Sequence, residues 1–192
     1  MDDALTGRNG AAVVDADVVP VPLRLYHTKV GPEWVDYNRH MSEWCYLLVM
    51  GENSDAFFRF IGIGDAYRDA GTSLFTVETH IRNLAEVTEG ERLHLTLQLL
   101  GADDKRVHLA HEIIRADDTV VATGEQLLIH VDTRSGRAAP MAEPLSRRVR
   151  RIVDAHRALP TPEWVGQVMR IPQASPASTA TNSPPEPRGG TG

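Results

Sequence analysis

The feature that most constrains the fold of this chain is a change of hydrophobic period near its middle. In residues 40–61 the apolar side chains recur every three or four positions, as on an α-helix, and they cover much of its girth. From Phe75 onward the apolar residues alternate with polar ones, which is the period of a half-buried β-strand. We therefore expect one long, mostly buried helix followed by strands.

Four alternating segments follow the expected helix, at residues 75–81, 93–99, 107–113 and 127–131. Short turn sequences separate them, at Glu89-Gly90, Asp103-Asp104 and Asp117-Asp118. Successive strands joined by short turns form an antiparallel meander. A further strand is expected at residues 23–30, and two C-terminal helices are expected within residues 143–170.

This order of elements predicts an α+β fold in which one helix lies on one sheet of about five strands. The helix is apolar around much of its girth, so a flat sheet would leave part of it uncovered. A sheet that curls around the helix would cover it, and that arrangement is the hotdog fold. A curled sheet still leaves an open edge, so we expect a homodimer or a dimer of dimers.

The two ends of the chain differ in composition from its centre. Residues 172–192 contain no large apolar residue and are rich in Pro and Gly, so they cannot offset the backbone entropy lost on ordering. Residues 1–22 contain four Asp and are interrupted by Gly and Pro. We predict a compact domain at residues 23–171, between a flexible segment at 1–22 and a disordered tail at 172–192.

Composition argues against several classes of function. The net charge of −6 disfavours nucleic-acid binding, which needs a concentrated basic face. A single cysteine, Cys45, excludes internal disulfides and zinc sites with two thiolates, and it is typical of a reducing cytosol. No apolar run approaches the roughly 20 residues that a bilayer requires, and the N-terminus does not read as a secretory signal. We therefore expect a cytoplasmic protein without a metal or a membrane partner.

One stretch at the entrance of the helix combines groups that can do chemistry. Residues 34–41, with the sequence WVDYNRHM, bring a carboxylate, an amide and an imidazole next to aromatic side chains. The chain contains no G-x-S-x-G elbow, P-loop or complete dinucleotide loop that would compete with this stretch. A structural role is the alternative, in which Asn38 or Asp36 caps the helix and His40 covers its first turn.

Two segments resemble the hotdog-fold acyl-CoA thioesterases related to hydroxybenzoyl-CoA thioesterase: DYNRHM at residues 36–41 and FTVETHI at residues 75–81. Residues 100–103 and 122–132 add a similarity to the betainyl-CoA thioesterases of carnitine breakdown. The resemblance implies hydrolysis of a short acyl-CoA, with betainyl-CoA as the candidate substrate and no cofactor. It also implies that the Asp-x-x-x-His pattern forms the site.

The resemblance assigns a role to each residue of that pattern. Asp36 would be the general base for water or a nucleophile, and His40 would orient the carbonyl or hold Asp36. Asn38 would position water or the Asp36 side chain. The backbone N–H groups of His40 and Met41, at the helix N-terminus, would stabilise the oxyanion.

Three arginines are candidates for binding the phosphates of CoA, and each could instead be a solvated surface charge. Arg39 occupies a position where the family commonly has glycine, so its side chain would either restrict the approach of the thioester or contact a phosphate. Arg82 and Arg106 are the other two.

The acyl pocket is expected to be aromatic, because a quaternary ammonium group is best held by aromatic faces. Trp34, Tyr37 and Trp44 are the candidates, and the first two are better placed because they lie in a loop, whereas Trp44 could belong to the helix core. Glu78 lies on the same strand face as His80. It either belongs to an exposed polar face or joins the active site of a second subunit.

The sequence therefore predicts an acyl-CoA thioesterase. A hotdog hydratase or dehydratase would also use a His and a carboxylate. A non-catalytic acyl-CoA-binding module would bind the ligand and release no thiol. Both alternatives remain open at this point.

Overall fold

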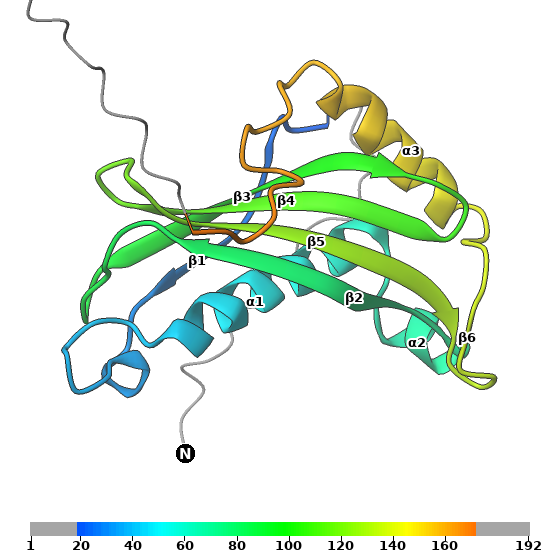
Figure 1. The fold of residues 1–192 in the computed structure, drawn as a ribbon. Coiled ribbons are helices and arrows are strands. Elements are labelled where there is room, and N and C mark those ends of the chain that lie inside the picture. The colour runs from blue at the N-terminus through cyan, green and yellow to red at the C-terminus, as the bar shows by residue number, and fades with distance from the viewer. Residues whose placement is uncertain (1–18, 172–192) are drawn as a thin grey trace, which may run out of the picture.

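The computed structural model describes residues 19–171 as one curled sheet with a long helix along its inner face (Figure 1). In chain order the elements are β1 (Leu23–Lys29), the 3-10 turn η1 (Pro32–Trp34), α1 (Glu43–Ile61), α2 (Asp65–Asp69), β2 (Thr72–Asn83), β3 (Arg92–Ala102), β4 (Arg106–Arg115), β5 (Val120–Asp132), β6 (Arg137–Ala138) and α3 (Leu145–His156).

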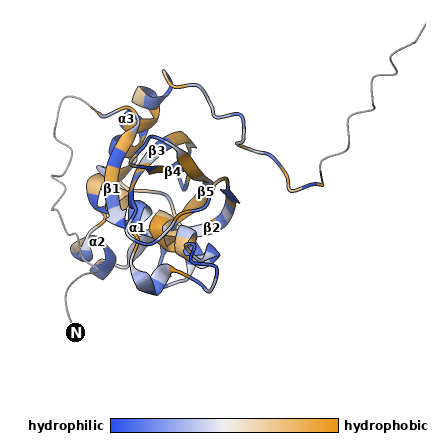
Figure 2. Ribbon diagram, turned by 90° about the vertical axis from the view of Figure 1, so that its left-hand side faces the viewer, coloured by the Kyte–Doolittle hydropathy of each residue, from blue (hydrophilic) through white to orange (hydrophobic). Residues whose placement is uncertain are grey.

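The strands are antiparallel and pair in the order β1-β3-β4-β5-β2, with the short β6 added to β5. Seen from the side in Figure 2, the strands curve around α1. Hydrophobic residues of the strands form two buried clusters with those of the helix. The α+β hotdog fold predicted from the sequence is therefore confirmed. The three expected turns also lie where the sequence places them, between β2 and β3, β3 and β4, and β4 and β5.

Helix α1 forms the centre of the domain because most of its side chains are buried against the sheet. It ends at Gly62, whose φ of 94° is left-handed and whose N–H donates to the carbonyl of Arg59 at 3.1 Å. On β5, Gly124 faces the helix, and a Cβ at that position would collide with the sulfur of Met50. Gly124 therefore permits the close approach of helix and sheet.

Two apolar clusters hold α1 in place. One surrounds its C-terminal half and includes Phe57, Ile61 and, from α3, Val149 and Ile152. The other surrounds its N-terminal half and takes in residues that flank the candidate motif, among them Trp34, Met41 and Val87. The segment that carries the motif is thus anchored to the core at both of its ends.

A small hydrogen-bonded network lies between α1 and the sheet. His111 on β4 is fully buried, with Nδ1 3.0 Å from Nδ2 of Asn53 and Nε2 3.0 Å from Oε1 of Gln126. Ser54 also donates to this Gln126 oxygen, at 2.9 Å. Because the Asn53 amide nitrogen is a donor, Nδ1 of His111 must accept, which leaves the ring neutral with its proton on Nε2. Burial lowers the pKa of His111 to about 4, and its hydrogen bond to Gln126 raises that pKa by a smaller amount.

Two expectations about helices need correction. The long helix begins at Glu43 and not at residue 40, because His40 pairs with Thr88 and the N–H of Met41 donates to Val87 O at 2.7 Å. The C-terminal segment contains one helix, α3, and not two, since residues 157–170 are irregular. Pro160 and Pro162 explain this, because proline removes a backbone donor and disfavours the helical conformation in the preceding residue.

The predicted flexible ends fall mostly outside the described residues, at 1–18 and 172–192. Val19, which the sequence assigned to the flexible N-terminal segment, is buried in the cluster around α3. Among residues 19–171, no helix has the length and apolar character needed to cross a membrane.

Candidate active site

The candidate motif folds as a tight hairpin placed directly before α1. The N–H of Asp36 donates to His40 O at 3.0 Å, and the N–H of Arg39 donates back to Asp36 O at 2.9 Å. A third bond, from Ser42 N–H to Trp34 O at 2.8 Å, closes the base of the hairpin. Asp36 and His40 are therefore neighbours across a turn that precedes α1.

The carboxylate of Asp36 is fixed by its own turn. Its Oδ1 accepts the N–H of Asn38 at 2.7 Å, which is the bond of an Asx turn, and the side chain is half-buried. Asn38 itself is exposed, and it bonds to the Asp36 carboxylate through its backbone N–H and not through its amide side chain. The Asp36 side chain is therefore held within the turn that precedes α1.

Arg39 lies in the left-handed region, with φ at 65°. A side chain there costs roughly 1–2 kcal/mol, because its Cβ approaches the following carbonyl oxygen. This backbone geometry gives a physical reason for a glycine at the same position. The Arg39 side chain is exposed, so it leaves the turn accessible.

The substitution Arg39→Gly is expected to raise the free energy of unfolding by about 0.5–1 kcal/mol, since glycine adopts positive φ without this steric cost. Urea denaturation of both proteins measures the difference. Asn38→Gly is the matched control, because this exposed neighbour does not have positive φ and should gain nothing. A stability of Arg39→Gly at or below that of the wild type would contradict the strain.

His40 contacts a residue that the sequence did not single out. Its Nε2 lies 3.2 Å from Oε2 of Glu86, in the loop between β2 and β3. The same carboxylate lies near Tyr46, whose pKa is raised first by burial and then by Glu86. Glu86 could be found only from the fold, because 45 residues separate it from His40 and no local pattern marks it. It is a candidate for orienting the imidazole.

One of the two backbone donors expected at the helix start is already engaged. The N–H of Met41 is bonded to Val87 O, so Met41 cannot serve an oxyanion and that part of the prediction is corrected. Ser42 is the N-cap residue and its side chain makes no capping bond. The backbone N–H groups of Glu43 and Trp44, in the first turn of α1, therefore receive no bond from that side chain. These two amides, beside the hairpin, are the better candidates for stabilising negative charge.

Cys45 is excluded as a nucleophile by its surroundings. Its side chain is fully buried, and its S–H donates to Trp34 O at 3.6 Å. Burial raises the pKa of the thiol, and the nearby Glu33 raises it further, so the reactive thiolate is disfavoured.

For two of the aromatic candidates, Trp34 and Trp44, the observed exposure is the opposite of the expected one. Trp34 is only 6% exposed, because η1 turns it into the core, so it offers no open face to a ligand. Tyr37 and Trp44 are 93% and 56% exposed. The two aromatic side chains open to a ligand are thus Tyr37 on the hairpin and Trp44 in the first turn of α1.

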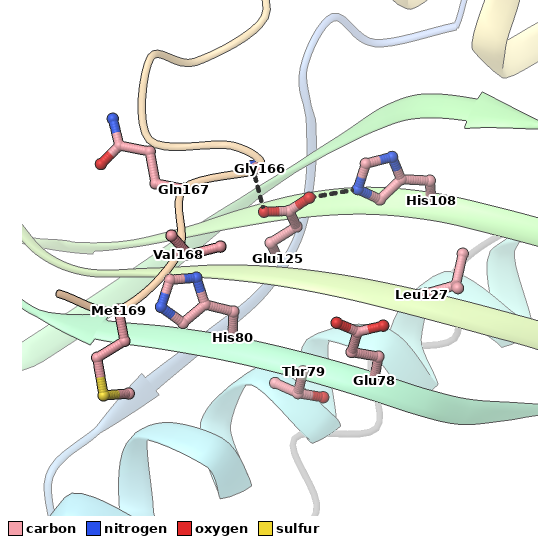
Figure 3. A pocket seen from close by; sticks show the side chains of 10 residues that line it. All are labelled: Glu78, Thr79, His80, His108, Glu125, Leu127, Gly166, Gln167, Val168 and Met169. Atoms are coloured by element: carbon pink, nitrogen blue, oxygen red, sulfur yellow. Dashed lines mark hydrogen bonds and ion pairs between the residues drawn. The ribbon is translucent and has the colours of Figure 1, made fainter.

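Glu78 and His80 lie on the outer face of the sheet, away from α1. They pair in register with Leu127 and Glu125, which alternate along β5 with residues that face the helix. Figure 3 shows them lining a cavity of about 620 Å³ under residues 166–169. At its floor Glu125 accepts from Gly166 N–H at 2.8 Å and lies 2.7 Å from Nε2 of His108. Within one chain, Glu78 is therefore separated from Asp36 by the sheet.

The three candidate arginines do not form one group. Arg39 and Arg82 lie toward the end of the sheet that carries the hairpin, and Arg82 donates to the Gln167 side chain at 3.4 Å. Arg106 lies at the opposite end of β3 and β4, where its Nε donates to Asp103 at 2.8 Å. An acyl-CoA bound at Asp36 of the same chain would be far from Arg106. Among the described residues, no group of three or more His, Cys, Asp or Glu is arranged to hold a metal ion.

Comparison with known proteins decides the family. The family model of the thioesterase-like superfamily matches residues 30–149, which include the hairpin, α1 and most of the sheet. The chain belongs to the thioesterase-like superfamily. Two solved structures have the same fold as this chain over 81% of its length. One is a Staphylococcus aureus protein in complex with CoA, at 25% identity and a TM-score of 0.72, matched over 99% of its chain. The other is a candidate thioesterase from Pseudomonas putida, at 34% identity and 0.70, matched over its whole chain.

Two curated relatives of this superfamily member carry more specific names. The betainyl-CoA thioesterase of Pseudomonas aeruginosa is 45% identical over 152 residues, which are 78% of this chain and 96% of that protein. The L-carnitine dehydrogenase/betainyl-CoA thioesterase of Rhizobium meliloti is 44% identical over 147 residues, which are 76% of this chain. The chain spans only 30% of the length of this second relative.

Proposed function

We propose that this protein hydrolyses a short acyl-CoA thioester, with betainyl-CoA as the substrate. The observation that supports the proposal is the hairpin of residues 34–42, whose backbone bonds make Asp36 and His40 neighbours directly before α1, where Ser42 makes no side-chain capping bond. A base and a set of N–H donors beside one another are what hydrolysis of a thioester requires.

The reaction can be written with the chain's own groups. Asp36 takes a proton from a water molecule as the water oxygen attacks the thioester carbonyl carbon. The carbonyl oxygen becomes an oxyanion, which the N–H groups of Glu43 and Trp44 stabilise. The C–S bond then breaks, the leaving thiolate takes up the proton, and the products are the free acid and CoA. In the second form of the mechanism Asp36 attacks directly and water cleaves the resulting anhydride.

The choice of betainyl-CoA rests on two supports. The relatives named above carry this substrate in their names, at 44–45% identity. In addition, Tyr37 and Trp44 expose aromatic faces next to the proposed oxyanion site, where they can hold a trimethylammonium group by cation–π attraction.

The substitution Trp44→Ala is expected to lower kcat/KM for betainyl-CoA about tenfold, the equivalent of roughly 1.4 kcal/mol of lost cation–π attraction. The matched control substrate is the neutral carbon isostere, in which a tert-butyl group replaces the trimethylammonium group. Its turnover should fall much less, and Trp44→Phe should restore part of the selectivity. Equal losses on the two substrates would argue against an aromatic cage.

The proposal includes a homodimer. Strand β2 is an edge of the sheet, twelve residues long, and it pairs with β5 on one side only among the described residues. Phe75 and Val77 on this edge are half exposed, as is Leu47 on α1. A second copy that adds its own β2 would pair the open edge and cover this apolar surface. Sedimentation equilibrium should therefore give the mass of two or four chains.

A thiol-release assay over a panel of acyl-CoAs tests the function as a whole. We expect release of CoA from betainyl-CoA, with slower release from neutral short-chain substrates. Hydration of an enoyl-CoA without release of thiol would instead identify a hydratase. Binding of acyl-CoA with neither reaction would identify a non-catalytic module, and either result would overturn the proposal.

A further inference from the structure

A second cavity on the outer face of the sheet lies under the segment that follows α3. It has a volume of about 290 Å³ and shares no lining residue with the cavity under residues 166–169. Thr96 on β3 and Glu112 on β4, which pair in register, form part of its floor. His111, next to Glu112, faces α1 and bonds to Asn53, so Glu112 lies on the opposite face of the sheet. The sheet therefore separates this cavity from the hairpin of the same chain.

The segment after α3, orange in Figure 1, crosses the outer face of the sheet and is tied to it by hydrogen bonds. The side-chain amide of Gln98 donates to Pro160 O at 3.2 Å. Further along the segment, the N–H of Gly166 donates to Glu125 at 2.8 Å. Trp164 lies between these two anchors, so its indole is held at the wall of the cavity.

Glu112 is the only charged side chain among the described residues that line the cavity. It is half-buried and accepts one hydrogen bond, from Oγ1 of Thr96 at 3.3 Å. Within residues 19–171 it forms no ion pair with a Lys, Arg or His side chain. A half-buried carboxylate without a cationic partner attracts positive charge, because the surrounding protein keeps part of the water away.

The walls of the cavity are mostly apolar. Pro22, Leu159, Pro160 and Pro162 line it together with Trp164, which is itself half-buried. A primary ammonium group carries three N–H donors and would leave some of them without acceptors between such walls. A quaternary ammonium group has no donor, and the face of an indole attracts it. The lining therefore favours a quaternary over a primary ammonium group.

We propose that this cavity binds the quaternary ammonium group of a small organic ligand. The indole of Trp164 contributes cation–π attraction, Glu112 contributes the opposite charge, and the proline rings contribute apolar contact. The volume is at the lower limit of the roughly 300–1,000 Å³ of sites that enclose a drug-sized ligand, so the ligand is small. The site does not depend on the proposed function, because its occupation is measured by binding alone.

Two kinds of compound carry this group, and each has a simple probe. Choline represents a cation, and betaine represents a zwitterion whose carboxylate adds a negative charge. The neutral control is 3,3-dimethylbutan-1-ol, which is choline with a carbon atom in place of the nitrogen.

The test follows the indole N–H signals of the three tryptophans by NMR while each probe is added to the full chain at constant ionic strength. The variants Trp44→Phe and Trp164→Phe assign the signals of these two residues. We expect choline to shift the Trp164 signal until it saturates. The neutral control should bind about tenfold more weakly, because it lacks the charge that the indole and Glu112 attract.

The variant Glu112→Gln should weaken choline binding about tenfold and leave the neutral control unchanged. Its amide oxygen can still accept from Thr96, so the floor of the cavity should be preserved. Glu163→Gln is the matched control, because it removes the same charge beside Trp164 at a residue that does not line the cavity. Its dissociation constant for choline should stay within twofold of the wild type. Tm verifies the fold of each variant, and the comparison of choline with its neutral control needs no variant.

Each outcome bears on the site. A Trp164 signal that does not move with choline would overturn it, as would equal affinities for choline and the neutral control, or equal weakening by both glutamine substitutions. Movement of the Trp44 signal alone would direct the cation to the candidate active site and would also overturn the proposal. Tighter binding of choline than of betaine would support the site and identify a simple cation as its ligand. Betaine binding at least as tight as that of choline would support the site and identify the zwitterion.

Discussion

The substitution Asp36→Asn is expected to lower kcat/KM for betainyl-CoA by about 10³-fold, equivalent to roughly 4 kcal/mol of transition-state stabilisation. The amide cannot take a proton from water or attack the thioester, so both proposed roles of Asp36 predict this loss. The variant keeps Oδ1, which accepts the Asn38 N–H at 2.7 Å, so the turn should remain folded. Thiol release under kcat/KM conditions measures the loss, and Tm verifies the fold.

A carboxylate in the same region provides the control. Glu33 lies in η1, two residues before the hairpin pair of Val35 and Met41, and its side chain is exposed. Glu33→Gln removes the same charge near the site without touching the proposed base, so its activity should stay within about threefold of the wild type. If Asp36→Asn retained more than a tenth of the activity, the base would have to be another group. Glu86, next to His40, would then be the first to test.

The fold could be predicted from the sequence because its signals are local and repeated. The change from helical to alternating period marks α1 and the four strands that follow, and the short sequences Glu89-Gly90, Asp103-Asp104 and Asp117-Asp118 mark the turns. The errors arise where distant contacts override local pattern. Residues 40 and 41 continue the helical spacing, but their backbone pairs with Val87 and Thr88 of the β2–β3 loop and the helix starts later.

The candidate site was predictable only in part, for the same reason. The sequence points to Asp36 and His40 because they lie close together in a motif. The contact of His40 with Glu86 depends on how the β2–β3 loop returns to α1, and sequence spacing does not encode that. For Trp34 and Trp44 the sequence predicted the opposite of the exposure that the structure shows, because both residues fit an apolar pattern equally well. Which of the two faces the sheet is decided by the 3-10 turn at Pro32–Trp34.

The largest expected effect on stability comes from His111, which is fully buried on β4. Its pKa of about 4 in the folded protein lies below the value of 6.5 for an unperturbed side chain. The unfolded chain therefore binds more protons than the folded one between pH 6.5 and pH 4. The free energy of unfolding must fall as the pH is lowered through this window, by about 3 kcal/mol in total.

Other titrating groups can be separated from this effect. Burial also lowers the pKa of His156, which adds a loss of the same sign. Hydrogen bonds with Arg106 and Arg115 lower the pKa values of Asp103 and Asp117 to about 2, so these carboxylates lose their contribution only below pH 4. The window between pH 6.5 and pH 4 therefore reports chiefly on the buried histidines.

The variant His111→Gln isolates the contribution of His111, because glutamine can still hydrogen-bond to Asn53 and Gln126 but does not titrate. Urea denaturation at pH values from 7.5 to 4 should show that the wild type loses about 3 kcal/mol more than this variant, whatever its stability at pH 7.5. Parallel curves for the wild type and His111→Gln would mean that His111 is not held neutral. In that case the Asn53 amide must present its oxygen to the ring, because a protonated Nδ1 donates a hydrogen bond that the amide nitrogen cannot accept.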